Sequence, residues 1–254
     1  MPVESPRPQY RQLADLIRAA IEQGEYPPGS ELPAEDQLAS LHGVSRATVN
    51  RAVLILRGEG AVRVIRGRGT VVRELPVLRR DGIARQRADL REAGAARGAF
   101  QAELARLGLS ARSEVGVTEE APPAEIASLL GIEPGALAVT RQRRMYGNEV
   151  PVQLAISYLP RDIAAGTRLA DPDSGPGGIY SRLAELGYAP SAFSESVRIR
   201  LPEADEAAFL IMDAEQRVFA IRRLASTAAG RVVEVNDIVL PAHQWELHYE
   251  WRAG

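Results

Sequence analysis

The chain has 254 residues, of which 45% are hydrophobic and 25% are charged, a composition typical of globular protein built from about two domains. It contains no cysteine, which excludes disulfide bonds and thiolate metal sites, and its three histidines lack the spacing of metal ligands, so we expect neither a metal nor a cofactor. No run of residues is apolar enough to span a membrane and the N-terminus lacks the apolar core of a signal peptide, so we expect a cytoplasmic protein.

The charge is distributed unevenly along the chain, although the formal net charge is only −2. Between Leu41 and Arg73 there are seven Arg and a single acid, Glu59. A local basic stretch in a nearly neutral chain is typical of a surface that meets a polyanion. A solvated face would give the same pattern, and the charge alone does not decide between the two interpretations.

The first part of the chain has the pattern of consecutive short helices. Apolar residues recur with helical spacing between Tyr10 and Glu22, before a turn rich in proline and glycine. A second helix is predicted over residues 34–41, with Leu38 and Leu41 directed inward and with Gly43 in the left-handed conformation that ends many helices. The second helix and the turn at Gly43 predict the first half of a helix-turn-helix.

A third helix and a hairpin complete this region. Ser45 is a good N-cap residue, and the helix that follows is interrupted by Gly58 and Gly60. Its predicted buried face consists of Val49, Ala52, Val53 and Leu56. Valines flank the turn Gly67-Arg68-Gly69, which predicts a two-stranded hairpin. Residues 1–75 are therefore predicted to form a winged helix-turn-helix, a DNA-binding fold whose third helix enters the major groove.

The residue types on the third helix and the hairpin suit contacts with DNA. Ser45 and Thr48 lie in the first turn of the helix, where hydroxyl and backbone N–H groups can meet phosphate. Arg46 can reach a guanine edge or a phosphate, and Asn50 can pair with adenine. The arginines of residues 66–69 can enter an adjacent minor groove. A purely structural role for the cap and the glycines does not explain why arginines gather on both elements.

Several segments in this region match, in order, the pattern of one bacterial regulator family. They are Tyr10-Arg11-Gln12-Leu13-Ala14, Pro28-Gly29, Leu32-Pro33-Ala34-Glu35, Gly43-Val44-Ser45-Arg46-Ala47-Thr48-Val49, Glu59-Gly60 and Gly67-Arg68-Gly69-Thr70. The region resembles the GntR family, and the resemblance implies DNA contacts by Ser45, Arg46, Thr48, Asn50, Arg66 and Gly67. The outward-facing Ala47 and Arg51 of the helix and Arg68 of the hairpin complete the predicted interface. Members often carry Arg at the position of Asn50, so we expect a different base preference. Some members use an Arg of the second helix where this chain has Asp36, so we do not expect that contact here.

The rest of the chain has the pattern of a connector followed by a mixed domain. Residues 76–98 have the composition of a linker, partly helical in our prediction, and residues 99–254 alternate between short helices and strands. Helices are predicted over residues 100–106, 123–130, 178–185 and 203–210, and strands over 115–119, 136–146, 150–158, 194–200, 218–226, 232–240 and 245–251. Consecutive hairpins with interspersed helices predict an antiparallel α+β domain.

This second domain also resembles a known module. The matching segments are Phe100-Gln101-Ala102-Glu103-Leu104, Leu107-Gly108, Ala127-Ser128-Leu129-Leu130-Gly131, Arg141-Gln142-Arg143, Val150-Pro151, Ser157-Tyr158-Leu159-Pro160 and residues 183–187. They resemble the UTRA effector domain of the HutC-type branch of the GntR family. The resemblance implies a chorismate-lyase-like fold that binds a ligand without catalysis, and a homodimer. It also implies an effector pocket that includes Arg141, Arg143, Ser157 and Glu234.

The expected effector is an anion. Arg141 and Arg143 are alternate residues of one predicted strand, so their side chains share a face and can converge on one negative group. The alternative is that both are ordinary solvent-side strand residues. Members that bind sugar phosphates usually have Glu at the position of Ala155 and Tyr at that of Leu240, which argues here for a less polar anion.

We therefore expect a transcription regulator whose partners are an inverted-repeat operator in double-stranded DNA and a small-molecule effector that releases the protein from it. One alternative is a constitutive DNA-binding protein whose second domain only dimerises. A less favoured one is an enzyme of chorismate-lyase-like fold, because the sequence contains no nucleophile elbow, no phosphate-binding loop and no HExxH motif. We accordingly assign no catalytic residue.

Overall fold

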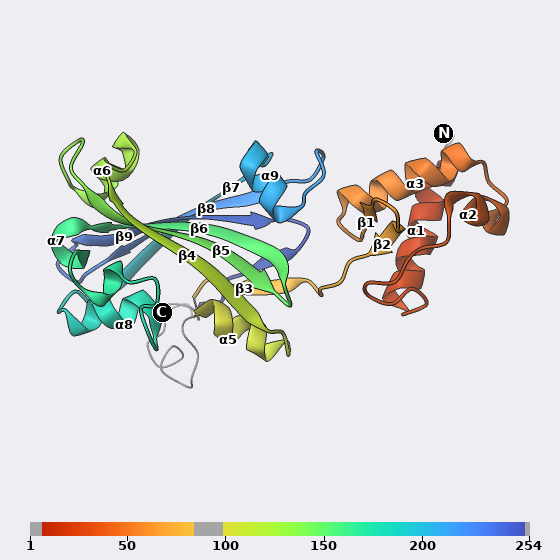
Figure 1. Ribbon diagram of the computed structural model, residues 1–254. Coiled ribbons are helices and arrows are strands. Elements are labelled where there is room, and N and C mark those ends of the chain that lie inside the picture. The colour runs from red at the N-terminus through yellow and green to blue at the C-terminus, as the bar shows by residue number, and fades with distance from the viewer. Residues whose placement is uncertain (1–6, 84–98, 252–254) are drawn as a thin grey trace. The chain divides into compact units, whose positions relative to one another are not determined.

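The computed structural model describes residues 7–83 and 99–251 (Figure 1). The chain divides into two compact units, one formed by residues 1–77 with 213–216 and the other by residues 78–212 with 217–254. Within the described ranges, no helix has both the length and the apolar character needed to cross a bilayer.

The N-terminal unit is the predicted winged helix-turn-helix. Its elements are α1 (Gln9–Glu22), α2 (Glu35–His42), α3 (Arg46–Gly58), β1 (Val62–Ile65) and β2 (Gly69–Val72). The two strands pair antiparallel, with Val62 opposite Val72 and Ile65 opposite Gly69. The hairpin between them is the wing of the motif.

Local signals position α3 within this unit. The Ser45 side chain accepts a hydrogen bond from the Thr48 amide at 3.1 Å, as expected of an N-cap, and Gly43 has φ 63°. The buried core lies between α1, α2 and α3 and contains Leu13, Ala14, Ile17, Leu38, Val49, Ala52, Val53 and Leu56. The inward prediction for Leu41 is wrong, since its side chain is exposed. The reason is that α2 ends at His42 and the chain turns at Gly43, so that Val44 packs against the core instead.

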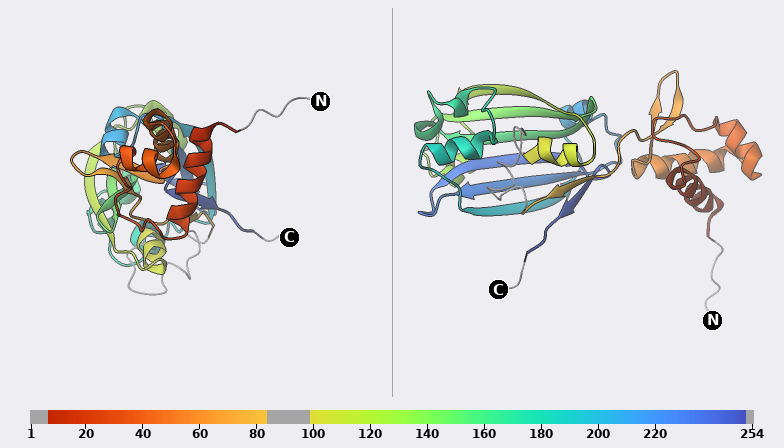
Figure 2. Two further views of the ribbon diagram at one scale, coloured as in Figure 1. Left: turned by 90° about the vertical axis from the view of Figure 1, so that its right-hand side faces the viewer. Right: turned by 90° about the horizontal axis from the view of Figure 1, so that it is seen from below.

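The C-terminal unit is built on one antiparallel sheet of six strands in the order β4-β5-β6-β9-β8-β7 (Figure 2). The strands are β4 (Ala111–Glu120), β5 (Ala138–Gly147), β6 (Val150–Pro160), β7 (Ala192–Arg200), β8 (Val218–Ser226) and β9 (Val232–Pro241). The helices are α5 (Ala99–Arg106), α6 (Ala124–Leu130), α7 (Arg161–Ala164), η2 (Arg168–Ala170), α8 (Gly178–Glu185) and α9 (Ala204–Leu210). The expectation of an antiparallel α+β domain is confirmed, with α7 and η2 as additions.

Helices cover the two faces of this sheet separately. In Figure 1, α5 and α8 lie on one side and α6 and α9 on the other. Leu159 and Val233 pack with α7 and α8 in one apolar cluster, whereas Tyr158 and Val235 pack with α6 in another. Because neighbouring strand residues point to opposite faces, Leu159 and Tyr158 of β6 lie on opposite sides, whereas Val233 and Val235 of β9 do so because the β8–β9 register shifts at this point.

A short parallel pair departs from the predicted organisation. Strand β3 (Leu78–Asp81) pairs with β10 (Trp245–His248), and Leu78 lies opposite Trp245. The first part of the predicted linker is therefore a strand of the second unit, not a connector or a helix. The final strand ends before the predicted residue 251. Most of the predicted linker, residues 84–98, lies outside the described residues.

Candidate nucleic-acid interface and buried cavity

The third helix exposes most of the residues predicted to contact DNA. Ser45, Arg46, Ala47, Asn50 and Arg51 are exposed on α3. Thr48 is partly buried, and its hydroxyl lies 2.9 Å from that of Ser45. The outward face of α3 is thus available to a partner, as the helical spacing predicted.

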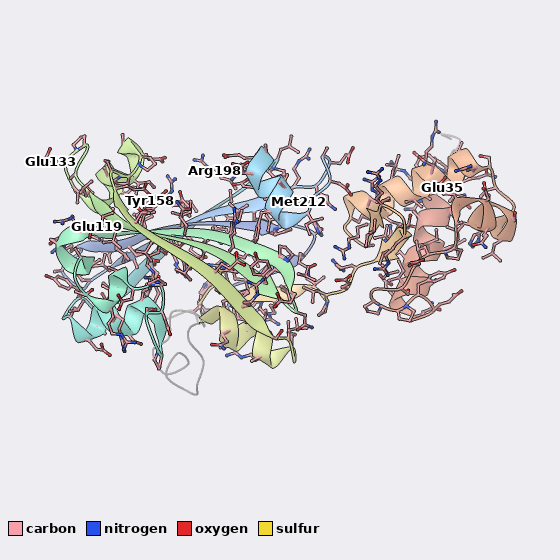
Figure 3. The ribbon with its side chains drawn as sticks, viewed as in Figure 1. Glu35, Glu119, Glu133, Tyr158, Arg198 and Met212 are labelled. Carbon is pink, nitrogen blue, oxygen red and sulfur yellow. The ribbon has the colours of Figure 1, made fainter. Side chains whose placement is uncertain are left out.

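One acid on α2 organises this face, and sequence reasoning did not identify it. Glu35, labelled in Figure 3, accepts a hydrogen bond from Arg46 Nε at 3.0 Å and another from Asn50 Nδ2 at 3.2 Å. A carboxylate accepts only, so the amide nitrogen of Asn50 must face Glu35. The Asn50 oxygen and its second N–H remain available, and these are the groups that pair with adenine. The only available signal was the position of Glu35 in the matched Leu-Pro-Ala-Glu segment.

The wing exposes the remaining predicted contacts. Arg66, Gly67 and Arg68 are exposed at the hairpin turn. Gly67 and Gly69 have φ values of 83° and 91°, which other residues adopt only with strain, so the tight turn depends on glycine. Arg68 Nε donates to Glu31 at 3.2 Å, a surface pair that a phosphate can readily replace.

Removing the Arg46 side chain separates two possible roles of this residue. If Arg46 contacts a base, Arg46→Ala should weaken specific binding by roughly 1–3 kcal/mol while leaving non-specific binding almost unchanged. If it only neutralises a phosphate, all sequences should weaken alike and the salt slope should fall by about one unit. Fluorescence anisotropy over a range of salt concentrations measures both quantities. Arg46→Lys is the matched control, because it keeps the charge but not the bidentate geometry. Unchanged affinity in Arg46→Ala would remove Arg46 from the interface.

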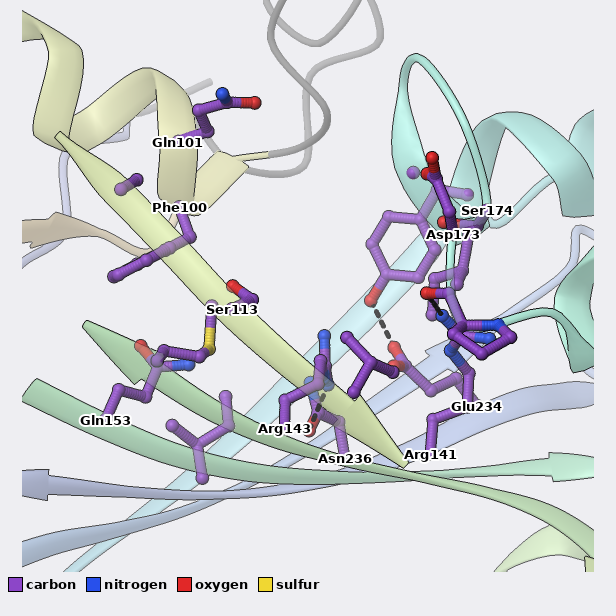
Figure 4. A pocket seen from close by; sticks show the side chains of 18 of the residues that line it. Phe100, Gln101, Ser113, Arg141, Arg143, Gln153, Asp173, Ser174, Glu234 and Asn236 are labelled. Carbon is purple, nitrogen blue, oxygen red and sulfur yellow. Dashed lines mark hydrogen bonds between the residues drawn. The ribbon is translucent and has the colours of Figure 1, made fainter. Parts of the chain in front are cut away.

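The C-terminal unit contains a cavity of about 570 Å³, partly open to solvent, against one face of its sheet (Figure 4). The walls come from α5, from β4, β5, β6, β8 and β9, and from the segment that enters α8. The charged residues that line it are Arg112, Arg141, Arg143, Arg223, Asp173 and Glu234. Apolar lining is provided by Phe100, Val115, Met145 and Ile238, among others. The cavity therefore combines a charged region with an apolar one.

Arg141 is held by the main chain of the loop that follows α7. Its guanidinium donates to the carbonyl oxygens of Leu169 at 2.7 Å, of Pro172 at 3.0 Å and of Asp171. The side chain is buried, and burial lowers the pKa of Arg141, while the nearby carboxylates partly oppose this effect. Much of the hydrogen-bonding capacity of Arg141 is thus used to hold this loop.

Arg143 reaches the cavity from the same face of β5. Its Nη2 donates to Ser157 Oγ at 2.5 Å and to Asn236 Oδ1 at 3.2 Å. Burial lowers the pKa of Arg143 to about 10, and Glu234 partly opposes this effect, so the side chain remains charged at neutral pH.

Glu234 completes the predicted set and connects it to an aromatic residue. Ser157 donates to Glu234 Oε1 at 2.6 Å, and the Tyr180 hydroxyl donates to Glu234 Oε2 at 2.5 Å. Burial and the adjacent carboxylate raise the pKa of Tyr180, which therefore stays a hydrogen-bond donor. Ser157 does not line the cavity, but it accepts a hydrogen bond from Arg143 and donates one to Glu234. The structure thus brings all four predicted residues together and adds Tyr180, which the sequence showed only as part of a helix.

Polar residues also form a continuous row across the sheet. At one level of the strand register the successive partners are Arg141, Ser157, Asn236, Arg223 and Glu195, on β5, β6, β9, β8 and β7 in that order. Residues directly opposite each other on paired strands share a face, so the row lies on the cavity side of the sheet.

The row ends at strand β3. Arg80 Nη1 donates to Glu195 Oε2 at 3.0 Å, and the Tyr249 hydroxyl donates to the same oxygen at 2.8 Å. The side chains of Arg80 and Glu195 are 0% and 6% exposed, so this ion pair is fully buried. Burial alone would raise the pKa of Glu195, but the hydrogen bond and charge of Arg80 lower it below its ordinary value. Elsewhere, no group of three His, Asp or Glu side chains in the described part of the chain is placed to hold a metal ion.

Comparisons with known proteins agree with this architecture. Residues 9–72 match the family model of bacterial regulatory proteins of the gntR family, and residues 106–245 match that of the UTRA domain. An uncharacterised HTH-type transcriptional regulator of Streptomyces coelicolor is 34% identical over 234 residues, which cover 89% of this chain and 86% of that protein.

One further relative matches the N-terminal part of the sequence, and a solved structure matches the fold. The mannosyl-D-glycerate transport/metabolism system repressor MngR of Escherichia coli is 46% identical over 68 residues, 27% of this chain and 28% of that protein. The crystal structure of PhnF from Mycobacterium smegmatis superposes with a TM-score of 0.60 at 24% identity, over 95% of this chain and 99% of that one, a likeness of fold. The named relatives are transcriptional regulators and not enzymes. The chain belongs to the GntR family of bacterial transcriptional regulators, in the branch that carries a UTRA effector domain.

Proposed function

We propose that this regulator is a repressor, which binds an operator as a homodimer and is released when a small anion occupies the cavity. The charged side chains of the cavity are the main support for this proposal. Three buried or half-buried guanidinium groups, Arg141, Arg143 and Arg223, face one buried carboxylate, Glu234, and the other carboxylate of the lining, Asp173, is exposed. In a region shielded from water, this excess of positive charge favours an anionic ligand. The relative that is 46% identical over 68 residues is named as a repressor, which supports repression rather than activation.

The cavity supports an effector that is less polar than a sugar phosphate. Its volume of about 570 Å³ lies within the range of small-molecule sites, roughly 300–1,000 Å³. Ala155 and Leu240, where sugar-phosphate-binding members carry polar residues, are both buried here. Met145 and Ile238 offer apolar surface to the body of the ligand. We therefore propose an acid with an apolar body, acting on a cytoplasmic protein at its operator.

The DNA-binding part of the proposal is tested by footprinting on the promoter of the protein's own gene. A two-fold dimer presents two copies of α3, so protection should cover an inverted repeat with half-sites about one helical turn or less apart. Analytical ultracentrifugation of the complex should give two chains per operator. A single half-site occupied by one chain would contradict the proposal.

A further inference from the structure

Arg223 is the least satisfied charged group of the cavity wall. It is 7% exposed, lines the cavity, and lies 5.4 Å from the centroid of the Tyr180 ring. Its closest ion pair is with Glu234, at 3.6 Å. Within the described ranges no hydrogen bond to its guanidinium is found, and its Nε is buried without an acceptor.

The other two buried or half-buried arginines of the cavity make more hydrogen bonds. Arg141 donates to three carbonyl groups and Arg143 to two side chains. Both oxygens of Glu234 already accept hydrogen bonds, from Ser157 and Tyr180. Nε of Arg223, like Nε of Arg143, is thus a buried donor without an acceptor, a defect that costs about 1–3 kcal/mol, and the Nη groups of Arg223 make no hydrogen bond within the described residues. An oxyanion in the cavity supplies the missing acceptors.

Resting on the proposed function, we propose that Arg223 binds the oxyanion of the effector together with Arg143, and that occupancy reaches strand β3 through Glu195. Arg141, by contrast, holds the loop at residues 169–172. The shared chemistry of the ligand is a carboxylate or phosphate group, since both offer planar pairs of oxygens to a guanidinium.

The route to β3 follows from the strand register. Arg223 and Glu195 are directly opposite on β8 and β7, and the positive charge of Arg223 contributes to the lowered pKa of Glu195. Glu195 in turn holds Arg80 of β3. Strand β3 begins directly after residue 77, where the first compact unit gives way to the second along the chain. An anion that engages Arg223 neutralises a positive charge that shares Glu195 with Arg80 and repels Arg80, so the Arg80–Glu195 contact tightens.

Anion binding by the full-length chain tests the first half of this inference. Thermal melting is followed against inorganic phosphate in one arm and acetate in the other, in buffers free of both, and the arm that responds identifies the class of oxyanion. We expect a saturable rise of the melting temperature in the wild type. Arg223→Gln should weaken the apparent affinity about tenfold or more, since it removes a charged hydrogen-bond donor.

The control is the neighbouring residue on the same strand. Arg222 points to the opposite face, where it pairs with Asp237 and Glu125, so Arg222→Gln should keep the wild-type response. If Arg223→Gln fails to fold by circular dichroism, Arg223→Lys takes its place, and weaker binding is expected because an ammonium cannot form the bidentate contact. A folded Arg223 variant with wild-type affinity, or a wild type that responds to neither anion, overturns the inference.

Hydrogen exchange tests the relay, that is, the coupling from Arg223 through Glu195 to strand β3. The Leu78 amide donates to the Gln244 carbonyl at 2.8 Å, so exchange at residues 78–81 reports on the β3–β10 pair. The anion that shifts melting should slow this exchange in the wild type and leave it unchanged in Arg223→Gln. Unchanged exchange in the wild type would overturn the relay. Loss of operator response alone, with anion binding and exchange as expected, would instead count against the proposed function.

Discussion

Replacement of Arg80 by Met is expected to lower the free energy of unfolding of the C-terminal unit by roughly 3–5 kcal/mol. The Arg80–Glu195 pair is buried, and the loss of Arg80 leaves the Tyr249 hydroxyl as the one close donor to the Glu195 carboxylate among the residues that the structure describes. A buried charge without its partner is among the costliest defects a single substitution can create. Urea denaturation followed by the fluorescence of Trp245, which is buried opposite Leu78, measures the change.

Two variants control this experiment. The double variant Arg80→Met with Glu195→Leu removes both charges and should recover most of the lost stability, because an apolar pair of similar volume can replace a buried ion pair. Arg79→Met alters the exposed neighbour on the same strand and should change stability by less than about 0.5 kcal/mol. If Arg80→Met is as stable as the wild type, the pair does not hold β3.

Effector binding is expected to weaken operator binding roughly 5- to 150-fold in the wild type, a coupling of about 1–3 kcal/mol. The effector can do this only through a higher affinity for the state that does not bind DNA. Arg143→Ala should abolish the effect, because it removes a charged donor from the cavity wall. Operator affinity without effector should stay nearly unchanged, since Arg143 lies outside the winged helix-turn-helix. Anisotropy titrations with metabolite acids found by a melting screen measure both affinities.

Reciprocity and a neighbouring variant make this prediction strict. Operator DNA must weaken effector binding by the same factor, which calorimetry can check independently. Arg144→Ala changes the adjacent, exposed residue of β5 and should respond as the wild type does. A response retained in Arg143→Ala at the same effector concentration would place the anion elsewhere. Loss of operator binding without effector would make Arg143 a structural residue, and no response in the wild type would favour the constitutive DNA-binding alternative.

The N-terminal winged helix-turn-helix and its exposed recognition helix could be predicted from the sequence. The cap at Ser45, the left-handed Gly43 and the apolar spacing of α3 all depend on residues a few positions apart, and these local signals survive in a single sequence. The alternation of strands and helices after residue 99 could be predicted for the same reason. The antiparallel α+β class of the second domain follows from that alternation. Leu41 shows the limit, because helical spacing cannot tell where a short helix leaves the core.

The contacts between charged residues could be identified only from the three-dimensional structure. Strand β3 pairs with a segment near the other end of the chain, and no periodicity within residues 78–81 indicates that partner or the burial of Arg80. Glu35 acquires its place by facing α3 across the turn, and Arg223 acquires its place by its register between β7 and β9. Pairing between strands distant in sequence is set by packing and register rather than by local propensity. For that reason, the residues of the cavity could be named from the sequence in part, whereas the row that joins them to β3 could not.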